Sequence, residues 1–129
     1  MDTPPAVTFD TARVAGVVDL VLIPLRPSVL DIYAVEGTAA VVKATKARAL
    51  LVLNACQPST ITGESGTTME ARAALAGIGL RIAAASLAQR MDYTRALNSG
   101  EAVSEFAPDS KAAAEMRRLW REVQKEMIP

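Results

Sequence analysis

The chain has 129 residues, enough for one domain; half are hydrophobic and only 4% aromatic, so small aliphatic side chains must form its core. Fourteen basic and fourteen acidic residues cancel formally, which excludes nucleic-acid binding through bulk positive charge alone. The absence of histidine excludes a Ser-His-Asp or Cys-His nucleophile, a His-ligated zinc and a histidine pH switch. The single cysteine, Cys56, has no second cysteine for an internal disulfide and no histidine to activate it.

The apolar segments do not have the pattern of a membrane span or a secretory signal. The longest, residues 14–25, is interrupted by Asp19 and is shorter than the roughly 20 residues that a spanning helix needs. The N-terminal Met-Asp-Thr-Pro-Pro lacks the basic and apolar regions of a signal peptide. We therefore expect a cytoplasmic protein that makes no membrane contact.

Strand and helix signals alternate in the first half of the chain. Residues 19–24 form a continuous apolar run ended by proline, which predicts a short strand buried on both faces. Apolar residues then recur at helical spacing over residues 29–46, behind Ser28. Residues 48–54 repeat the apolar run and predict a second strand, followed by a loop through Gly66.

A second strand–helix–strand unit follows this loop. Thr67 and Thr68 are candidate N-caps of a helix that Gly77 and Gly79 end, before a short strand over residues 80–85. Strands that alternate with helices in this way indicate an α/β fold with a parallel sheet.

The last third of the sequence adds further elements. A short helix is predicted over residues 90–98, and residues 102–106 predict a brief edge strand or extended arm. Pro108-Asp-Ser110 opens a final helix with one apolar stripe, in which Trp120 is interpreted as a core anchor. Together the elements predict a single domain of three or four parallel strands with flanking helices.

Several short segments, taken in chain order, resemble the ParA family of partition ATPases. They are Asp2-Thr-Pro-Pro5, residues 15–31, Val52-Leu-Asn54, Ala88-Gln-Arg90 and Ser110-Lys-Ala-Ala113. The ordered set spans nearly the whole chain. The resemblance implies part of a doubly wound parallel sheet of the P-loop NTPase-like kind. It also implies a parent protein that binds Mg·ATP, dimerises and binds DNA non-specifically to segregate plasmids or chromosomes.

The resemblance assigns roles to two residues. Asp2 corresponds to the Walker B aspartate, which holds Mg²⁺ through water. Asn54 corresponds to the asparagine that reads adenine, because an amide offers both a donor and an acceptor to the base edge. The alternative for Asn54 is an ordinary turn residue at the end of a strand.

The family's phosphate loop is missing from the sequence. The loop precedes the Walker B aspartate in the family, whereas this chain begins one residue before Asp2, and no Gly-x-x-x-x-Gly-Lys-[Ser/Thr] occurs in it. We therefore expect a truncated domain that has no ATPase activity alone and binds no cofactor alone, Mg·ATP belonging to the intact family.

The resemblance also implies an open sheet edge, since the family's phosphate-loop strand lies beside the strand at residues 19–24. The edge residues are Val18, Leu20, Val21, Leu22 and Ile23. Bare apolar edges recruit partners. We hypothesise pairing with a second copy, giving a homodimer, or with a separately encoded N-terminal half.

Cations on the last helix are candidates for DNA contact. Arg118, Arg121 and Lys125 lie near one another on a helix and could bind phosphates without sequence preference. Because glutamates are interleaved with them, the alternative is a solvated face with i,i+4 ion pairs.

The sequence therefore supports two candidate functions. The first is the C-terminal portion of a ParA-like partition ATPase, with non-specific DNA and a ParB-type protein as partners. The second is a complete, non-enzymatic dimerising module that regulates an intact partition ATPase.

Overall fold

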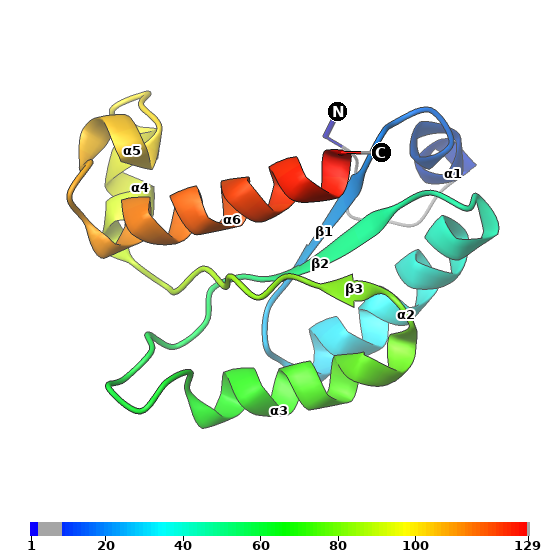
Figure 1. The fold of residues 1–129 in the computed structure, drawn as a ribbon, viewed down its shortest axis with the longest axis horizontal. Helices are drawn as coiled ribbons and strands as arrows, with labels where there is room; N and C mark the ends of the chain where they lie inside the picture. The colour runs from blue at the N-terminus through cyan, green and yellow to red at the C-terminus, as the bar shows by residue number, and fades with distance from the viewer. Residues whose placement is uncertain (3–8, 129) are drawn as a thin grey trace.

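A three-stranded parallel sheet forms the centre of the computed structural model, which describes residues 1–2 and 9–128 (Figure 1). The strand order is β1 (Val21–Leu25), β2 (Ala49–Leu53) and β3 (Arg81–Ile82). The predicted α/β class and parallel sheet are confirmed. The part of the Walker B resemblance that falls on residues 3–5 lies outside the described residues.

Helices cover both faces of the sheet. They are α1 (Phe9–Ala15), α2 (Val29–Ala44), α3 (Gly66–Leu75), α4 (Met91–Asn98), α5 (Val103–Phe106) and α6 (Lys111–Met127), with a short 3₁₀ turn, η1 (Ala76–Ile78), after α3. Helices α2 and α3 lie on one side of the sheet and α6 crosses the other, while α4 and α5 gather at one end of α6 (Figure 1). Within the described residues, no helix is long and apolar enough to cross a bilayer.

The core has two main layers, one on each face of the sheet. Ile23, Leu51 and Leu53 pack with Val42 of α2 and Leu75 of α3. On the other face, the buried side chains are Leu50, Val52, Ala83, Leu119 and Val123, the last two from α6. Because β2 is buried along its whole length, it is the central strand that the apolar run at residues 48–54 predicts.

The first strand differs from its prediction in two ways. It is not buried on both faces, since Leu22 is 46% exposed and Pro24 is also exposed. It also continues through Pro24 to Leu25 instead of ending at the proline. The N–H of Val21 and the carbonyl of Leu25 bond to the β2 side, so the alternating pattern turns position 24 away from β2. Proline is tolerated there because its missing N–H removes no hydrogen bond between β1 and β2.

Two helix predictions are also corrected. The N-cap of α3 is Ser65 and not Thr67 or Thr68, because the Ser65 hydroxyl accepts from the Thr68 N–H at 3.4 Å. Residues 103–106 form the short helix α5 in place of an edge strand, and the Glu105 carboxylate accepts from the Ala102 N–H at 2.9 Å.

Trp120 is not a core anchor. Its side chain is 57% exposed, whereas its neighbour Leu119 is 8% exposed and packs on the sheet. One residue turns a helix by about 100°, so the two side chains leave α6 in different directions. The small residues Ala112 and Ala113 complete the buried stripe at the start of α6.

Candidate nucleotide and nucleic-acid site

Asn54 lies at the carboxyl edge of the sheet. Its backbone N–H donates to the Leu25 carbonyl at 2.9 Å, so the carboxyl ends of β1 and β2 are adjacent. The chain then turns sharply through Ala55, which has a positive φ of 51°. Ligands of open α/β sheets bind beyond the carboxyl ends of the strands. The exposed Asn54 side chain is therefore on the edge where a base could be read.

A buttressed loop follows β1 at the same edge. The Asp31 carboxylate accepts from the Arg26 backbone N–H at 2.9 Å and from the guanidinium at 3.1 and 3.2 Å. Ser28 caps α2, its hydroxyl accepting from the Asp31 N–H at 3.2 Å. The Arg26 side chain holds the pKa of Asp31 at about 2, below its ordinary value of 3.8. Asp31 is thus an ionised structural group that joins β1 to α2, and not a proton donor at neutral pH.

A groove of about 750 Å³ runs along β1 between α1 and α2. Asp2 and Asp31 are the acidic residues of its lining, and Asn54 is not part of it. The structure therefore does not bring Asp2 and Asn54 into one cavity.

Mg²⁺ could be held here only through water and with few protein ligands. Among residues 1–2 and 9–128 there is no group of three side chains that could hold a metal ion. Mg²⁺ is commonly held by one or two carboxylates, with waters and substrate phosphates as the other ligands. The exposed Asp2 carboxylate suits that water-mediated role.

The cations predicted to contact DNA lie together. Arg118, Arg121 and Lys125 of α6 line a second cavity of about 360 Å³, whose other walls are Ala84, Ala85 and Glu122. All three side chains are exposed. The basic face, as we call Arg118, Arg121 and Lys125, is therefore one continuous surface.

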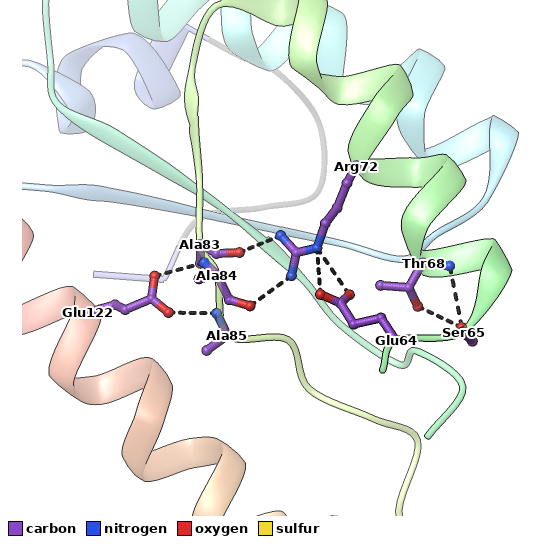
Figure 2. A network of polar contacts seen from close by, with 8 residues as sticks. All are labelled: Glu64, Ser65, Thr68, Arg72, Ala83, Ala84, Ala85 and Glu122. Atoms are coloured by element: carbon purple, nitrogen blue, oxygen red, sulfur yellow. Dashed lines mark hydrogen bonds and ion pairs between the residues drawn. The ribbon is translucent and has the colours of Figure 1, made fainter. Parts of the chain in front are cut away.

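The glutamates of α6 are engaged by groups other than the basic face. Glu115 pairs with Arg90 at 2.7 Å and Glu126 with Arg81 at 2.7 Å. Glu122 accepts hydrogen bonds from backbone N–H groups instead (Figure 2). No ion pair found in the described part of the chain joins these glutamates to the basic face. The helix face is solvated, but the i,i+4 ion pairs of the alternative are not among those found in the described part of the chain.

A polar clamp, formed by Arg72 and Glu122, holds the segment that follows β3 (Figure 2). Arg72 donates to the Ala83 and Ala84 carbonyls at 2.6 and 2.9 Å, and Glu64 pairs with its guanidinium at 2.9 Å. From the other side, Glu122 accepts from the Ala84 and Ala85 N–H groups at 2.9 and 2.6 Å.

The clamp explains why β3 is only Arg81–Ile82 and not the strand predicted over residues 80–85. The Ala83 N–H donates to Leu51 of β2, so the backbone groups of Ala84 point away from β2. Side chains, in place of another strand, satisfy those groups. Sequence reasoning missed Arg72 and Glu64, since no local pattern indicates an ion pair over eight residues or hydrogen bonds from Arg72 to carbonyls eleven and twelve residues away.

Cys56 has no role in catalysis in this arrangement. It is 2% exposed, and burial raises the pKa of its thiol. The buried thiol stays protonated at neutral pH and is a core residue below α3.

Of the comparisons with known proteins, only the one with solved structures gives a match. No protein-family model matches the sequence, and none of the curated proteins matches it significantly. Among solved structures, apo McdA from Cyanthece matches with a TM-score of 0.64 and 23% sequence identity. The match covers 81% of this chain but 46% of the McdA chain, so this chain spans less than half of that protein. The chain therefore has the fold of part of McdA.

Proposed function

We propose that the chain is the adenine-reading and DNA-binding portion of a ParA-type partition ATPase. The observation that carries this proposal is the basic face on α6, left without carboxylate partners because Glu115, Glu122 and Glu126 are all engaged elsewhere. The structural match to McdA supports the choice of family, and the resembling sequence segments support it independently.

The nucleotide would bind at the carboxyl edge of the sheet. Asn54 would donate to and accept from the adenine edge, and Asp2 would hold hydrated Mg²⁺ beside the phosphates. The phosphate loop must come from outside these 129 residues, since no Gly-x-x-x-x-Gly-Lys-[Ser/Thr] occurs among them. Without that loop, no backbone N–H groups or lysine would stabilise the negative charge that develops on the phosphates in the transition state of phosphoryl transfer.

DNA would lie across the exposed side of α6. Arginine and lysine contacts to phosphates give affinity without sequence preference. Because the chain has a formal net charge of zero, its net charge cannot supply this affinity. The affinity must come from the positive charges that are gathered on the basic face.

The experiment that tests the proposal is fluorescence anisotropy of a labelled random-sequence duplex, titrated with the chain at several salt concentrations. Arg118→Glu, Arg121→Glu and Lys125→Glu should each weaken binding and lower the salt slope by about 1 for each DNA phosphate that the variant no longer binds. Arg95→Glu is the matched control, because Arg95 is an exposed arginine on α4, away from the basic face. Equal losses of affinity at Arg95 and Arg121, or no duplex binding at low salt, would show the proposal to be wrong.

A further inference from the structure

Helix α6 carries two further cations on its solvent side, in addition to the basic face. Lys111 and Arg117 are both exposed, and no ion pair found in residues 1–2 and 9–128 involves either of them. The guanidinium of Arg117 donates to the Pro108 carbonyl at 3.0 Å, a neutral partner that leaves its charge in place. We call Lys111, Arg117 and the basic face together the basic ridge.

The side chains of the basic ridge leave α6 on one side. Residues seven apart in a helix lie almost in line, so Lys111, Arg118 and Lys125 form one row along α6. Arg117 and Arg121 form a second row, about 80° around the helix from the first. The ridge is therefore a band of positive charge that runs along the helix, and not a single cluster at one point.

The opposite side of α6 is covered by the rest of the protein. Leu119 and Val123 pack on the sheet, and Ala112 packs with residues of α4 and α5. Figure 1 shows the sheet along one side of α6, with α4 and α5 gathered at one end of the helix. The basic ridge thus lies on the side of α6 that faces away from the sheet.

The basic ridge lowers the stability of the helix that carries it. Lys111 is the first residue of α6, where the positive end of the helix dipole favours acidic side chains, and the first turn has none. Arg117, Arg121 and Lys125 follow one another at a spacing of four residues, at which like charges on a helix repel. A polyanionic partner would relieve both effects, which folding alone does not explain.

We propose that α6 lies lengthwise on the phosphate backbone of a DNA duplex, with the whole basic ridge in contact, an inference that rests on the DNA binding proposed above. Lys111 and Lys125 are fourteen residues apart, a distance of about 21 Å along a helix. Phosphates of one strand follow one another every 3.4 Å or so along the duplex axis, so the ridge matches about six base pairs.

The composition of the ridge favours a duplex over a single strand. Proteins that hold single strands combine cations with aromatic side chains on which the bases stack. The ridge has no aromatic residue, and Trp120 leaves α6 about 100° from Arg121 and about 160° from Arg118. Two rows of charge on a rigid helix match instead the regular phosphate spacing of a duplex.

Variants that remove one charge test how far the ridge extends. Lys111→Gln and Arg117→Gln should each weaken binding to a labelled duplex about five- to tenfold near 0.1 M salt, and each should lower the salt slope by about 0.9. Arg95→Gln, on α4, is the matched control and should change neither quantity. Lys111→Gln should leave the melting temperature unchanged or raise it, because it removes an unfavourable charge. A merely structural role of Lys111 would lower the melting temperature.

DNA hairpins with stems of about 3, 6, 9 and 12 base pairs test the lengthwise placement. The affinity should rise steeply up to about six base pairs, and then slowly as more positions become available. A single strand as long as the longest stem should bind at least about tenfold more weakly. Trp120→Ala should leave the affinity for the duplex unchanged, since its side chain lies outside the ridge.

The possible results separate this proposal from the proposed function. Failure of the wild-type chain to bind any duplex would overturn both. Duplex binding that Arg121→Glu weakens, but that Lys111→Gln and Arg117→Gln leave unchanged, would keep the DNA site and overturn the lengthwise ridge. Equal affinity for the two shortest stems, or a single strand bound as tightly as the duplex, would also overturn it. Circular dichroism of each variant checks that the fold is retained.

Discussion

Arg72 of α3 and Glu122 of α6 bind the same short stretch of backbone, Arg72 through carbonyl groups and Glu122 through N–H groups. This arrangement replaces a missing neighbouring strand with two side chains from opposite faces of the sheet. Glu122 also lines the same cavity as the basic face, with its carboxylate oxygens bound by the two N–H groups. One residue pair thus holds the segment that follows the last strand from both faces of the sheet.

The clamp predicts a loss of stability on truncation. Glu122→Ala leaves the Ala84 and Ala85 N–H groups without their acceptor and should lower the free energy of unfolding by about 1–3 kcal/mol. Urea denaturation measures the change. Glu70→Ala, at an exposed glutamate on α3, is the control and should change it little. Because Arg72 holds the same segment, the double variant should be non-additive; strict additivity would argue against the clamp.

The N-cap of α3 predicts a smaller effect at Ser65. Ser65→Ala removes the hydroxyl that accepts from the Thr68 N–H and should lower the free energy of unfolding by about 1 kcal/mol. Ser65→Asp should restore most of the loss, because aspartate is also a good cap. Thermal unfolding of these variants beside Thr67→Ala decides which residue is the cap. A larger effect at Thr67 than at Ser65 would contradict the assignment.

The Arg26–Asp31 pair predicts an acid-dependent stability. The folded-state pKa of Asp31 is about 2 and its ordinary value is 3.8, so the pair stabilises the fold fully above about pH 5 and loses this contribution as the pH falls toward 2. The stability difference between the wild-type chain and Arg26→Gln should be constant above pH 5 and shrink below pH 4. Thermal melts across this range measure it. A difference that stays constant down to pH 2 would count against the pair.

The missing phosphate loop predicts a negative result with nucleotide. The 129-residue chain alone should not hydrolyse ATP, and calorimetry with Mg·ATP should find no low-micromolar binding. A low-micromolar affinity that Asn54→Ala abolishes would refute this prediction, while supporting the role of Asn54 as an adenine contact. Asn98→Ala, at an exposed asparagine in α4, is the matched control for that variant.

Local patterns in the sequence predicted most of the fold. The apolar run of β2, the helical spacing of α2 and the start of α6 after Pro108-Asp-Ser110 are each decided by neighbouring residues, and each is confirmed. Trp120 was misplaced because an apolar stripe shows which residues are hydrophobic and not how much of the helix is covered. The coverage depends on where α6 crosses the sheet, and no local pattern carries that information.

The candidate site was predictable only in part. The three cations were recognisable by spacing along one helix. Their freedom from carboxylate partners was not, because Glu115 and Glu126 pair with Arg90 and Arg81, which are distant in sequence. The end of β3 at Ile82 was also missed, because Arg72, which binds the backbone after β3, lies on α3 and not in the strand itself.

The hydrogen bonds between the side chains of Arg72 and Glu122 and the backbone of residues 83–85 have a consequence for assembly. Because Arg72 and Glu122 bind the backbone of this segment, the groups that an added strand would need there are already hydrogen-bonded. A strand of another chain could extend the sheet at residues 83–85 only by displacing both side chains, which protects this border from edge-to-edge aggregation.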